Sequence, residues 1–155
     1  MTVMFSYPIT ATFHADAAPQ AVWDAITGVA RWAQVLPGVG EARIDPPGRL
    51  EAGATIRART GPQDSPVDLF YRVTLAEPPH RLTLESDTAA WRGRTEYTLE
   101  ADGSGTKVTV HSTMEVTGAL LRLQMLAVGK TMTKQREDAL RERTRLLLTL
   151  AERLA

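Results

Sequence analysis

The first regular alternation of apolar and polar residues spans residues 7–14. Tyr7, Ile9, Ala11 and Phe13 alternate with proline, threonine and histidine, and this period of two is typical of a strand with one buried face. Two short apolar segments follow at residues 19–27 and 29–36, and each is too short to form a stable helix without tertiary packing. The pattern therefore predicts one strand followed by two short, packed helices.

Six further segments have the pattern of strands and are separated by residues that favour turns. Proline, glycine and aspartate cluster at residues 45–48, 61–62, 78–79 and 101–105. Because the connections are short, consecutive strands are expected to pair as an antiparallel meander. The expected strands span residues 39–44, 54–60, 67–75, 81–86, 90–100 and 106–116.

Residues 119–155 have the periodicity of one long amphipathic helix, which Gly129 could kink. Such a helix must cover an apolar surface, and the predicted sheet is the surface that the sequence offers. The pattern thus indicates an α+β fold in the order β-αα-β6-α. At 100° per residue the apolar stripe contains Leu121, Met125, Val128, Met132, Arg136, Ala139, Arg143, Leu146, Leu147, Leu150 and Leu154.

The composition of the chain indicates how many domains it has and argues against several classes of function. The chain has 155 residues, 43% of them hydrophobic, and no internal linker, which indicates a single domain over residues 1–155. Its 18 basic and 18 acidic residues cancel, so no global field attracts nucleic acid, and the absence of cysteine excludes disulfides and thiol chemistry. Residues 1–8 do not resemble a signal peptide, and no apolar run reaches the roughly 20 residues of a membrane span. We therefore expect a cytoplasmic protein without an integral membrane segment.

The stretch from Ala18 to Val39 is the most specific motif of the chain. After the first strand it contains Ala18-Pro19, Val22-Trp23, Trp32 and Leu36-Pro37-Gly38. This motif resembles the start of the START-like superfamily, the helix-grip fold shared with polyketide cyclase/dehydrase-type proteins. The resemblance implies a curved antiparallel sheet wrapped around a long C-terminal helix, with a cavity between them. We interpret the two tryptophans as core anchors of the short helices and not as ligand contacts.

The inner face of the predicted sheet is apolar with a few hydroxyl groups. This composition suits a cavity for a hydrophobic molecule, but alternation alone does not separate a cavity from a packed core. The resemblance favours the cavity, and Gly93, which leaves space on the inner face, agrees with it. The predicted ligand-binding residues are Tyr71, Trp91, Thr95, Tyr97, Ser112, Met114, Met132 and Arg136.

Two arginines, Arg136 and Arg143, interrupt the apolar stripe of the C-terminal helix. A buried, unpaired guanidinium is costly, so each needs a partner, a route to water or an anionic ligand. For Arg143 we expect the aliphatic stem to cover apolar surface while the charge stays in water. For Arg136 this role and contact with a carboxylate or phenolate of a ligand are equal alternatives.

Several kinds of chemistry have no support in the sequence. His14, His80 and His111 lack the spacing of metal ligands, and the glycines match no nucleotide-binding motif. Ser112 has no histidine beside it on the inner face, and no pair of carboxylates points inward. We therefore expect no metal and no cofactor, and we assign no catalytic residue.

Six arginines lie on the predicted outer face of neighbouring strands. They could form a basic patch for an acidic partner, but Asp68, Glu85 and Glu96 share the same face. A solvated surface with cross-strand ion pairs is the favoured interpretation. The six are Arg57, Arg59, Arg72, Arg81, Arg92 and Arg94.

The resemblance implies a function in binding a hydrophobic or aromatic small molecule, polyketide-like or lipid-like. Some relatives promote cyclisation and dehydration with tyrosine, arginine and ordered water, and the candidates here are Tyr71, Tyr97 and Arg136. Two alternatives stay open: a lipid or quinone carrier without turnover, and an accessory module for protein assembly. The oligomeric state also stays open.

Overall fold

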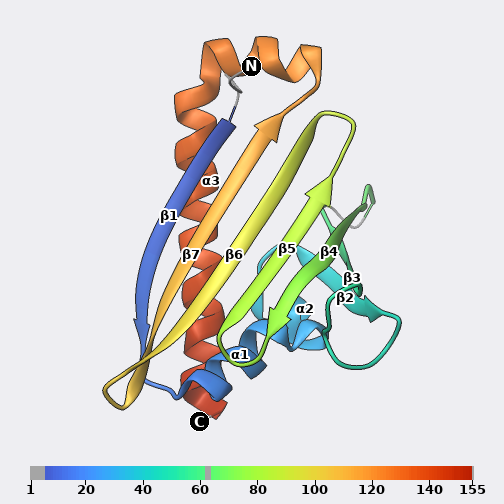
Figure 1. Cartoon of the computed structure of the whole chain (residues 1–155). Helices are drawn as coiled ribbons and strands as arrows, with labels where there is room; N and C mark the ends of the chain where they lie inside the picture. The colour runs from blue at the N-terminus through green and yellow to red at the C-terminus, as the bar shows by residue number, and fades with distance from the viewer. Residues whose placement is uncertain (1–5, 62–63, 155) are drawn as a thin grey trace.

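The computed structural model describes residues 6–61 and 64–154, which form an antiparallel sheet with the helices on one face (Figure 1). Three expectations fall on other residues: the absence of a signal peptide at residues 1–5, the turn at Pro62 and the helical end at Ala155 lie outside the described residues. The elements are β1 (Ser6–Ala15), α1 (Pro19–Thr27), η1 (Val29–Arg31), α2 (Trp32–Val35), β2 (Val39–Asp45), β3 (Thr55–Thr60), β4 (Val67–Glu77), β5 (Arg81–Asp87), β6 (Trp91–Asp102), β7 (Gly105–Val116) and α3 (Ala119–Leu154).

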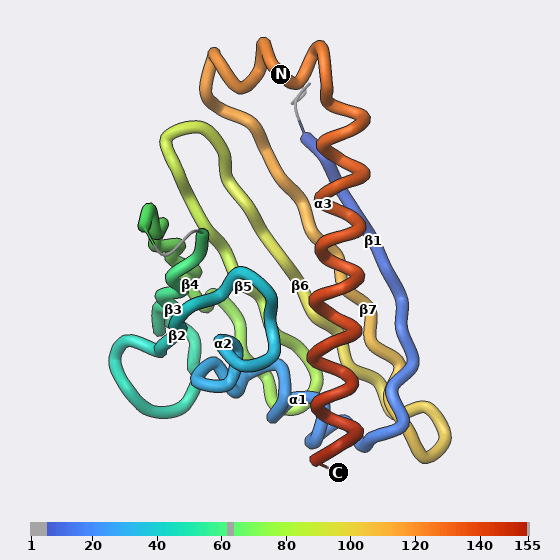
Figure 2. The backbone as a smooth tube through the Cα atoms, turned by 180° about the vertical axis from the view of Figure 1, so that it is seen from behind, coloured from blue at the N-terminus to red at the C-terminus, as the bar shows by residue number. Residues whose placement is uncertain are grey.

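The sheet has the strand order β1-β7-β6-β5-β4-β3-β2. Strands β2 to β7 form the expected meander, and β1 pairs antiparallel with β7, where Ile9 lies opposite Ser112. The sheet curves around α3, while α1 and α2 lie beside the C-terminal half of that helix (Figure 2). The predicted α+β helix-grip fold is therefore confirmed.

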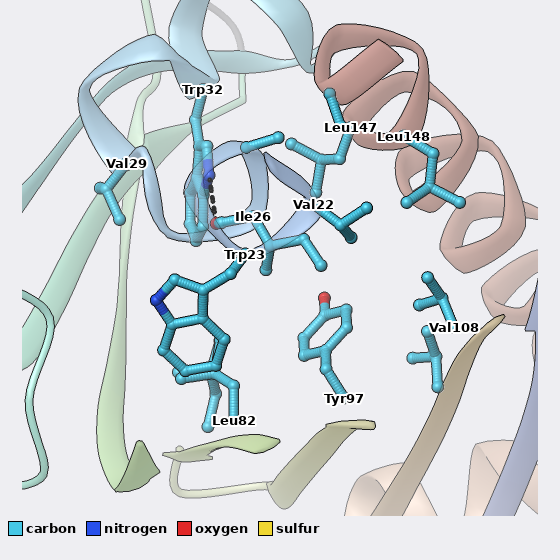
Figure 3. Packing of buried hydrophobic residues seen from close by; sticks show 14 of the residues in the cluster. Val22, Trp23, Ile26, Val29, Trp32, Leu82, Tyr97, Val108, Leu147 and Leu148 are labelled. Carbon is cyan, nitrogen blue, oxygen red and sulfur yellow. Dashed lines mark hydrogen bonds between the residues drawn. The ribbon is translucent and has the colours of Figure 1, made fainter. Parts of the chain in front are cut away.

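The short helices are held by tertiary packing, as their length requires. In α1 the side chains of Val22, Trp23 and Ile26 are buried, and α1 packs against α3. The indole Nε1 of Trp32 donates a hydrogen bond to the Ile26 carbonyl at 3.2 Å, which joins the start of α2 to the end of α1 (Figure 3). Both tryptophans thus have the anchoring role that the sequence predicted.

The buried face of α3 differs from the predicted stripe. Val128, expected to be buried, is 46% exposed, and Leu154 is 56% exposed. The reason is that the C-terminal half of α3 packs against α1 as well as against the sheet, so part of its buried face turns toward α1. The N-terminal turns of α3 also run at a steep angle to the rest of the helix (Figure 1). The buried residues of that C-terminal half are Leu140, Thr144, Leu147, Leu148 and Ala151.

The outer face of the sheet has the expected ion pairs. Each of the six arginines lies within 4.0 Å of a carboxylate. Hydrogen bonds from Arg57 and Arg59 lower the pKa of Asp68. Exposed pairs of this kind contribute little to stability. None of the described helices has the length and apolarity that crossing a membrane requires.

The packing of α3 against α1 predicts that Leu148→Ala destabilises the protein. Leu148 is 5% exposed, so removal of its side chain leaves a cavity and should lower the free energy of unfolding by about 2–5 kcal/mol. The matched control is Leu154→Ala on the same helix, which should change that free energy by less than about 0.5 kcal/mol. Equal effects in urea denaturation would contradict the packing described above.

Candidate ligand-binding cavity

The inner face of the sheet changes character along its strands. On β7, Val108 and Val110 are fully buried, whereas Ser112 and Met114 are half-buried although they point to the same side. β6 shows the same change: Tyr97 and Leu99 are buried, whereas Thr95, which lies earlier on this strand, is half-buried. The core therefore fills one end of the space between sheet and helix, and the other end is open.

A cavity of about 670 Å³ occupies this open end. Its exposed wall residues belong to the loop after α2, to the turn after β3 and to the middle of α3, so it opens to solvent among these three segments. The volume is within the range of sites for drug-sized molecules. The lining residues are Trp32, Leu36, Pro37, Gly38, Val39, Ala58, Thr60, Gly61, Leu69, Tyr71, Leu84, Ser86, Trp91, Gly93, Thr95, Tyr97, Ser112, Thr113, Met114, Arg136, Ala139, Leu140, Glu142, Arg143 and Leu147.

Seven of the eight predicted ligand-binding residues line this cavity. The exception is Met132, which is half-buried but is not part of the wall. The α3 part of the wall begins at Arg136, one helical turn further along the chain. Met132 thus lies outside the wall of this cavity, and its contact with a ligand stays a prediction. The seven are Tyr71, Trp91, Thr95, Tyr97, Ser112, Met114 and Arg136.

Arg136 is the polar residue of the wall with the most constrained geometry. Its Nη2 atom donates hydrogen bonds to two backbone carbonyls, that of Tyr7 on β1 at 2.5 Å and that of Ser112 on β7 at 3.3 Å. Its Nη1 atom is buried and has no hydrogen-bond partner among the described residues. Burial lowers the pKa of this guanidinium, which still carries its charge at neutral pH. The side chain therefore does not reach water in the way proposed for Arg143.

Hydroxyl groups supply most of the other polar atoms of the wall. Thr95 and Ser112 lie opposite each other on β6 and β7, and the Thr95 hydroxyl donates to the Ser112 hydroxyl at 3.4 Å. Burial raises the pKa of Tyr97, an effect that the nearby charge of Arg143 partly opposes. Tyr97 therefore stays protonated at neutral pH, and its hydroxyl points toward Val22 and Ile26 of α1 (Figure 3).

Gly93 has a different role from the one that the sequence suggested. A Cβ atom on Gly93 would lie 2.9 Å from Cζ3 of Trp91 and 3.0 Å from Oγ of Ser86. The space that this glycine leaves is therefore filled by the indole ring of Trp91. The result is that the Trp91 ring can lie against the sheet as part of the cavity wall.

Several wall residues were not among the predicted ones. Trp32 was interpreted as scaffold alone, yet it also lines the cavity, as do Pro37 and Gly38 of the motif that follows it. Glu142 and Arg143 line the exposed opening from α3. Helical periodicity already placed Arg143 in one stripe with Arg136, but the sequence holds no direct information on the loop after α2.

The wall provides hydrogen-bond donors and lacks an internal base. Arg136 and the hydroxyl of Tyr71 can donate to an oxygen atom of a bound molecule. Among the lining residues the single carboxylate is that of Glu142, which is exposed at the opening. Across residues 6–61 and 64–154, no three histidine or carboxylate side chains stand close enough to hold a metal ion. Chemically, this arrangement can surround an apolar molecule and donate hydrogen bonds to an oxygen atom that it carries.

The fold and the cavity define a helix-grip protein of the START-like class. The sequence profile of the family described as "Polyketide cyclase / dehydrase and lipid transport" matches residues 8–147, and the chain belongs to this family. Membership supports a function in hydrophobic ligand binding or of polyketide cyclase/dehydrase type. The resemblance seen in the Ala18–Val39 motif is thereby confirmed. Comparison with curated protein sequences finds no match.

Solved structures of the same fold include aromatase/cyclases. The di-domain ARO/CYC StfQ from the steffimycin biosynthetic pathway has a TM-score of 0.79 at 11% identity, covering 96% of this chain and 51% of that protein. The di-domain ARO/CYC BexL from the BE-7585A biosynthetic pathway has a TM-score of 0.71 at 22% identity, covering 96% of this chain and 49% of that protein. This chain therefore spans about half the length of those two di-domain proteins.

Two other similar structures match over nearly their whole length. The Zhui aromatase/cyclase from Streptomyces sp. R1128 has a TM-score of 0.72 at 14% identity, covering 96% of this chain and 94% of that protein. A START superfamily protein from Mycobacterium smegmatis has a TM-score of 0.72 at 13% identity, covering 96% of this chain and 99% of that protein. At these identities the comparisons show the fold alone.

The contact between Trp91 and Gly93 predicts that Gly93→Ala displaces the indole ring. The added methyl group would collide with Trp91, so the near-ultraviolet circular dichroism and the tryptophan emission should change while the far-ultraviolet spectrum stays the same. In a Trp91→Leu background, Gly93→Ala should leave the tryptophan signals unchanged. A spectral change of the same size in both backgrounds would show that another tryptophan responds.

The burial of Tyr97 predicts a loss of stability in alkaline solution. In the unfolded chain the tyrosine hydroxyl has a pKa of about 10, whereas burial raises the pKa of Tyr97 in the folded state. The stabilising effect is complete below about pH 10 and declines as the pH rises from there toward the folded-state pKa. The free energy of unfolding should therefore fall more steeply between about pH 9 and 11 in the wild type than in Tyr97→Phe. Parallel curves in urea denaturation would contradict this prediction.

Proposed function

We propose that the cavity between the sheet and α3 binds a hydrophobic or aromatic small molecule, polyketide-like or lipid-like, whose oxygen-bearing end contacts Arg136. The observation that carries this proposal is the buried Nη1 atom of Arg136, which has no partner among the described residues although Arg136 lines an otherwise largely apolar cavity. The family and the aromatase/cyclases of the same fold support the same class of ligand.

The geometry of Arg136 explains why an acceptor is needed there. A buried donor without a partner costs about 1–3 kcal/mol, and more when the group is charged. The two carbonyls of Tyr7 and Ser112 hold Nη2 of the guanidinium, while Nη1 is buried without a partner and would donate to a ligand once the side chain turns slightly toward the cavity. A carboxylate, phenolate or ketone oxygen would satisfy it, because arginine donates strong hydrogen bonds to such groups.

Promotion of cyclisation or dehydration is a finer form of this proposal. Arg136, with Tyr71 as a second donor, would polarise a carbonyl of a bound poly-ketone, and the ring of Tyr97 would form the floor beneath it. Proton removal would then involve water or Glu142 at the opening, since no other carboxylate is among the lining residues. The aromatase/cyclases of the same fold favour this form.

A carrier of lipid or quinone is the second candidate, and the words "lipid transport" in the family description favour it. Native mass spectrometry of freshly purified protein followed by incubation separates the two candidates. A carrier should release a co-purified molecule of unchanged mass, whereas a cyclase/dehydrase should release a product that has lost water. An accessory assembly module would need no cavity, and a volume of about 670 Å³ argues against this alternative.

The prediction that tests the proposal is that Arg136→Leu weakens binding of an anionic aromatic molecule. Two probes share their ring system: anilinonaphthalene sulfonate is anionic, and phenylnaphthylamine is neutral. A charge-assisted hydrogen bond contributes about 1.5–3 kcal/mol, so the variant should bind the sulfonate at least about tenfold more weakly. Its affinity for the neutral probe should change by less than about twofold, measured by fluorescence titration.

The matched control is Arg141→Leu, which removes the same charge from the same helix. Arg141 is not part of the cavity wall and pairs with Glu137 at 3.2 Å. This variant should bind both probes as the wild type does. Unchanged sulfonate affinity in a folded Arg136→Leu protein, or an equal loss for both probes, would overturn the proposed role of Arg136.

A further inference from the structure

The N-terminal turns of α3 expose an unusual number of large apolar side chains. Leu120, Leu123 and Leu126 are 71%, 65% and 73% exposed, and Val128 follows at 46%. Single exposed leucines need no explanation, but three within two turns of one helix form a continuous apolar surface. None of the four belongs to the wall of the cavity.

Basic residues follow these leucines on the same helix. At 100° per residue, Leu120 and Leu123 lie 60° apart, on the side opposite the buried Met125. Lys130 is exposed, and Lys134 is 78% exposed at its side chain. The N-terminal half of α3 therefore has exposed leucines in its first turns and exposed lysines in the next, and together these side chains form the exposed stripe of α3.

The charge of this region differs from that of the whole chain. The net charge is zero, yet residues 116–136 contain four basic residues and no acidic one. Arg136 is directed to the cavity, which leaves Arg122, Lys130 and Lys134 on the helix. The pair of Lys134 with Asp138 at 3.6 Å is exposed and hence weak. Beside the exposed leucines the surface therefore has a local positive charge.

The presence of both leucines and lysines on this surface helps to decide which partner covers it. A symmetric contact between two copies would bring the same patch of each together and would oppose like charges. An anionic lipid surface would accept both parts, because leucines enter the boundary between head groups and acyl chains while lysines reach the phosphates. Basic residues near such a surface are attracted to its negative charge.

We propose that the N-terminal turns of α3, with Leu120, Leu123, Leu126, Lys130 and Lys134, bind the surface of an anionic lipid bilayer. The contact is peripheral, since no described helix is long and apolar enough to span a membrane. It is separate from the cavity and does not depend on what the cavity binds.

Co-sedimentation with lipid vesicles tests this proposal. The wild type should bind vesicles of phosphatidylcholine and phosphatidylglycerol (about 3:1) at least about tenfold more tightly than pure phosphatidylcholine, and salt should weaken the binding. Leu120→Ser/Leu123→Ser should reduce binding about tenfold or more, and Lys130→Glu/Lys134→Glu should remove the preference for the anionic lipid. Absence of binding, or equal binding to both kinds of vesicle, would overturn the proposal, as would an acidic protein that binds this stripe while vesicles do not.

Two variants serve as controls for this measurement. Phe70→Ser removes an apolar side chain that is 55% exposed on β4, outside the stripe, and should leave vesicle binding unchanged. Arg136→Leu alters the cavity and should also bind vesicles as the wild type does. A loss of vesicle binding in Arg136→Leu would mean that the cavity, and not the surface of α3, takes up the lipid.

Discussion

The packing of α1 against the C-terminal half of α3 is the contact on which the remaining structure depends. The sheet curves around a helix of 36 residues, which at 1.5 Å per residue is about 54 Å long. The short helices fill the space between sheet and α3 only beside Leu147 and Leu148 (Figure 3). Further along α3 no element takes their place, so the inner side chains of β6 and β7 become the wall of a cavity. The space between the sheet and α3 is therefore filled by core residues beside the C-terminal half of α3 and holds a cavity beyond it.

Arg136, on α3, lines this cavity and is held in place by strands β1 and β7. Its two acceptors are carbonyls of β1 and β7, which pair along the whole length of β1. The backbone thus holds the guanidinium in place without neutralising its charge. A carboxylate partner in the protein would have satisfied the arginine more fully. The two carbonyls occupy Nη2 alone, so Nη1 remains without a partner among the described residues.

The sequence predicted the strands, their order and their inner face, because a period of two residues encodes which side chains point inward. It could not predict where core gives way to cavity. Val110 and Ser112 lie on the same face of β7, and their difference in burial depends on how far α1 and α2 extend above them. The misplaced Val128 has the same origin, since periodicity assumes one straight helix against one surface. The partners of Arg136 were beyond prediction because backbone carbonyls carry no residue identity.

On α3, the residues that pack the core and Arg136, which lines the cavity, lie mostly in different parts of the helix. The buried side chains of α3 lie mostly from Leu140 onward, where they pack against α1 and the sheet. A donor left unsatisfied at Arg136 lowers stability, and a fold tolerates such a group when other contacts compensate for it. The packed end supplies that compensation. Substitutions in the wall of the cavity should therefore cost less stability than substitutions in the seam between α1 and α3.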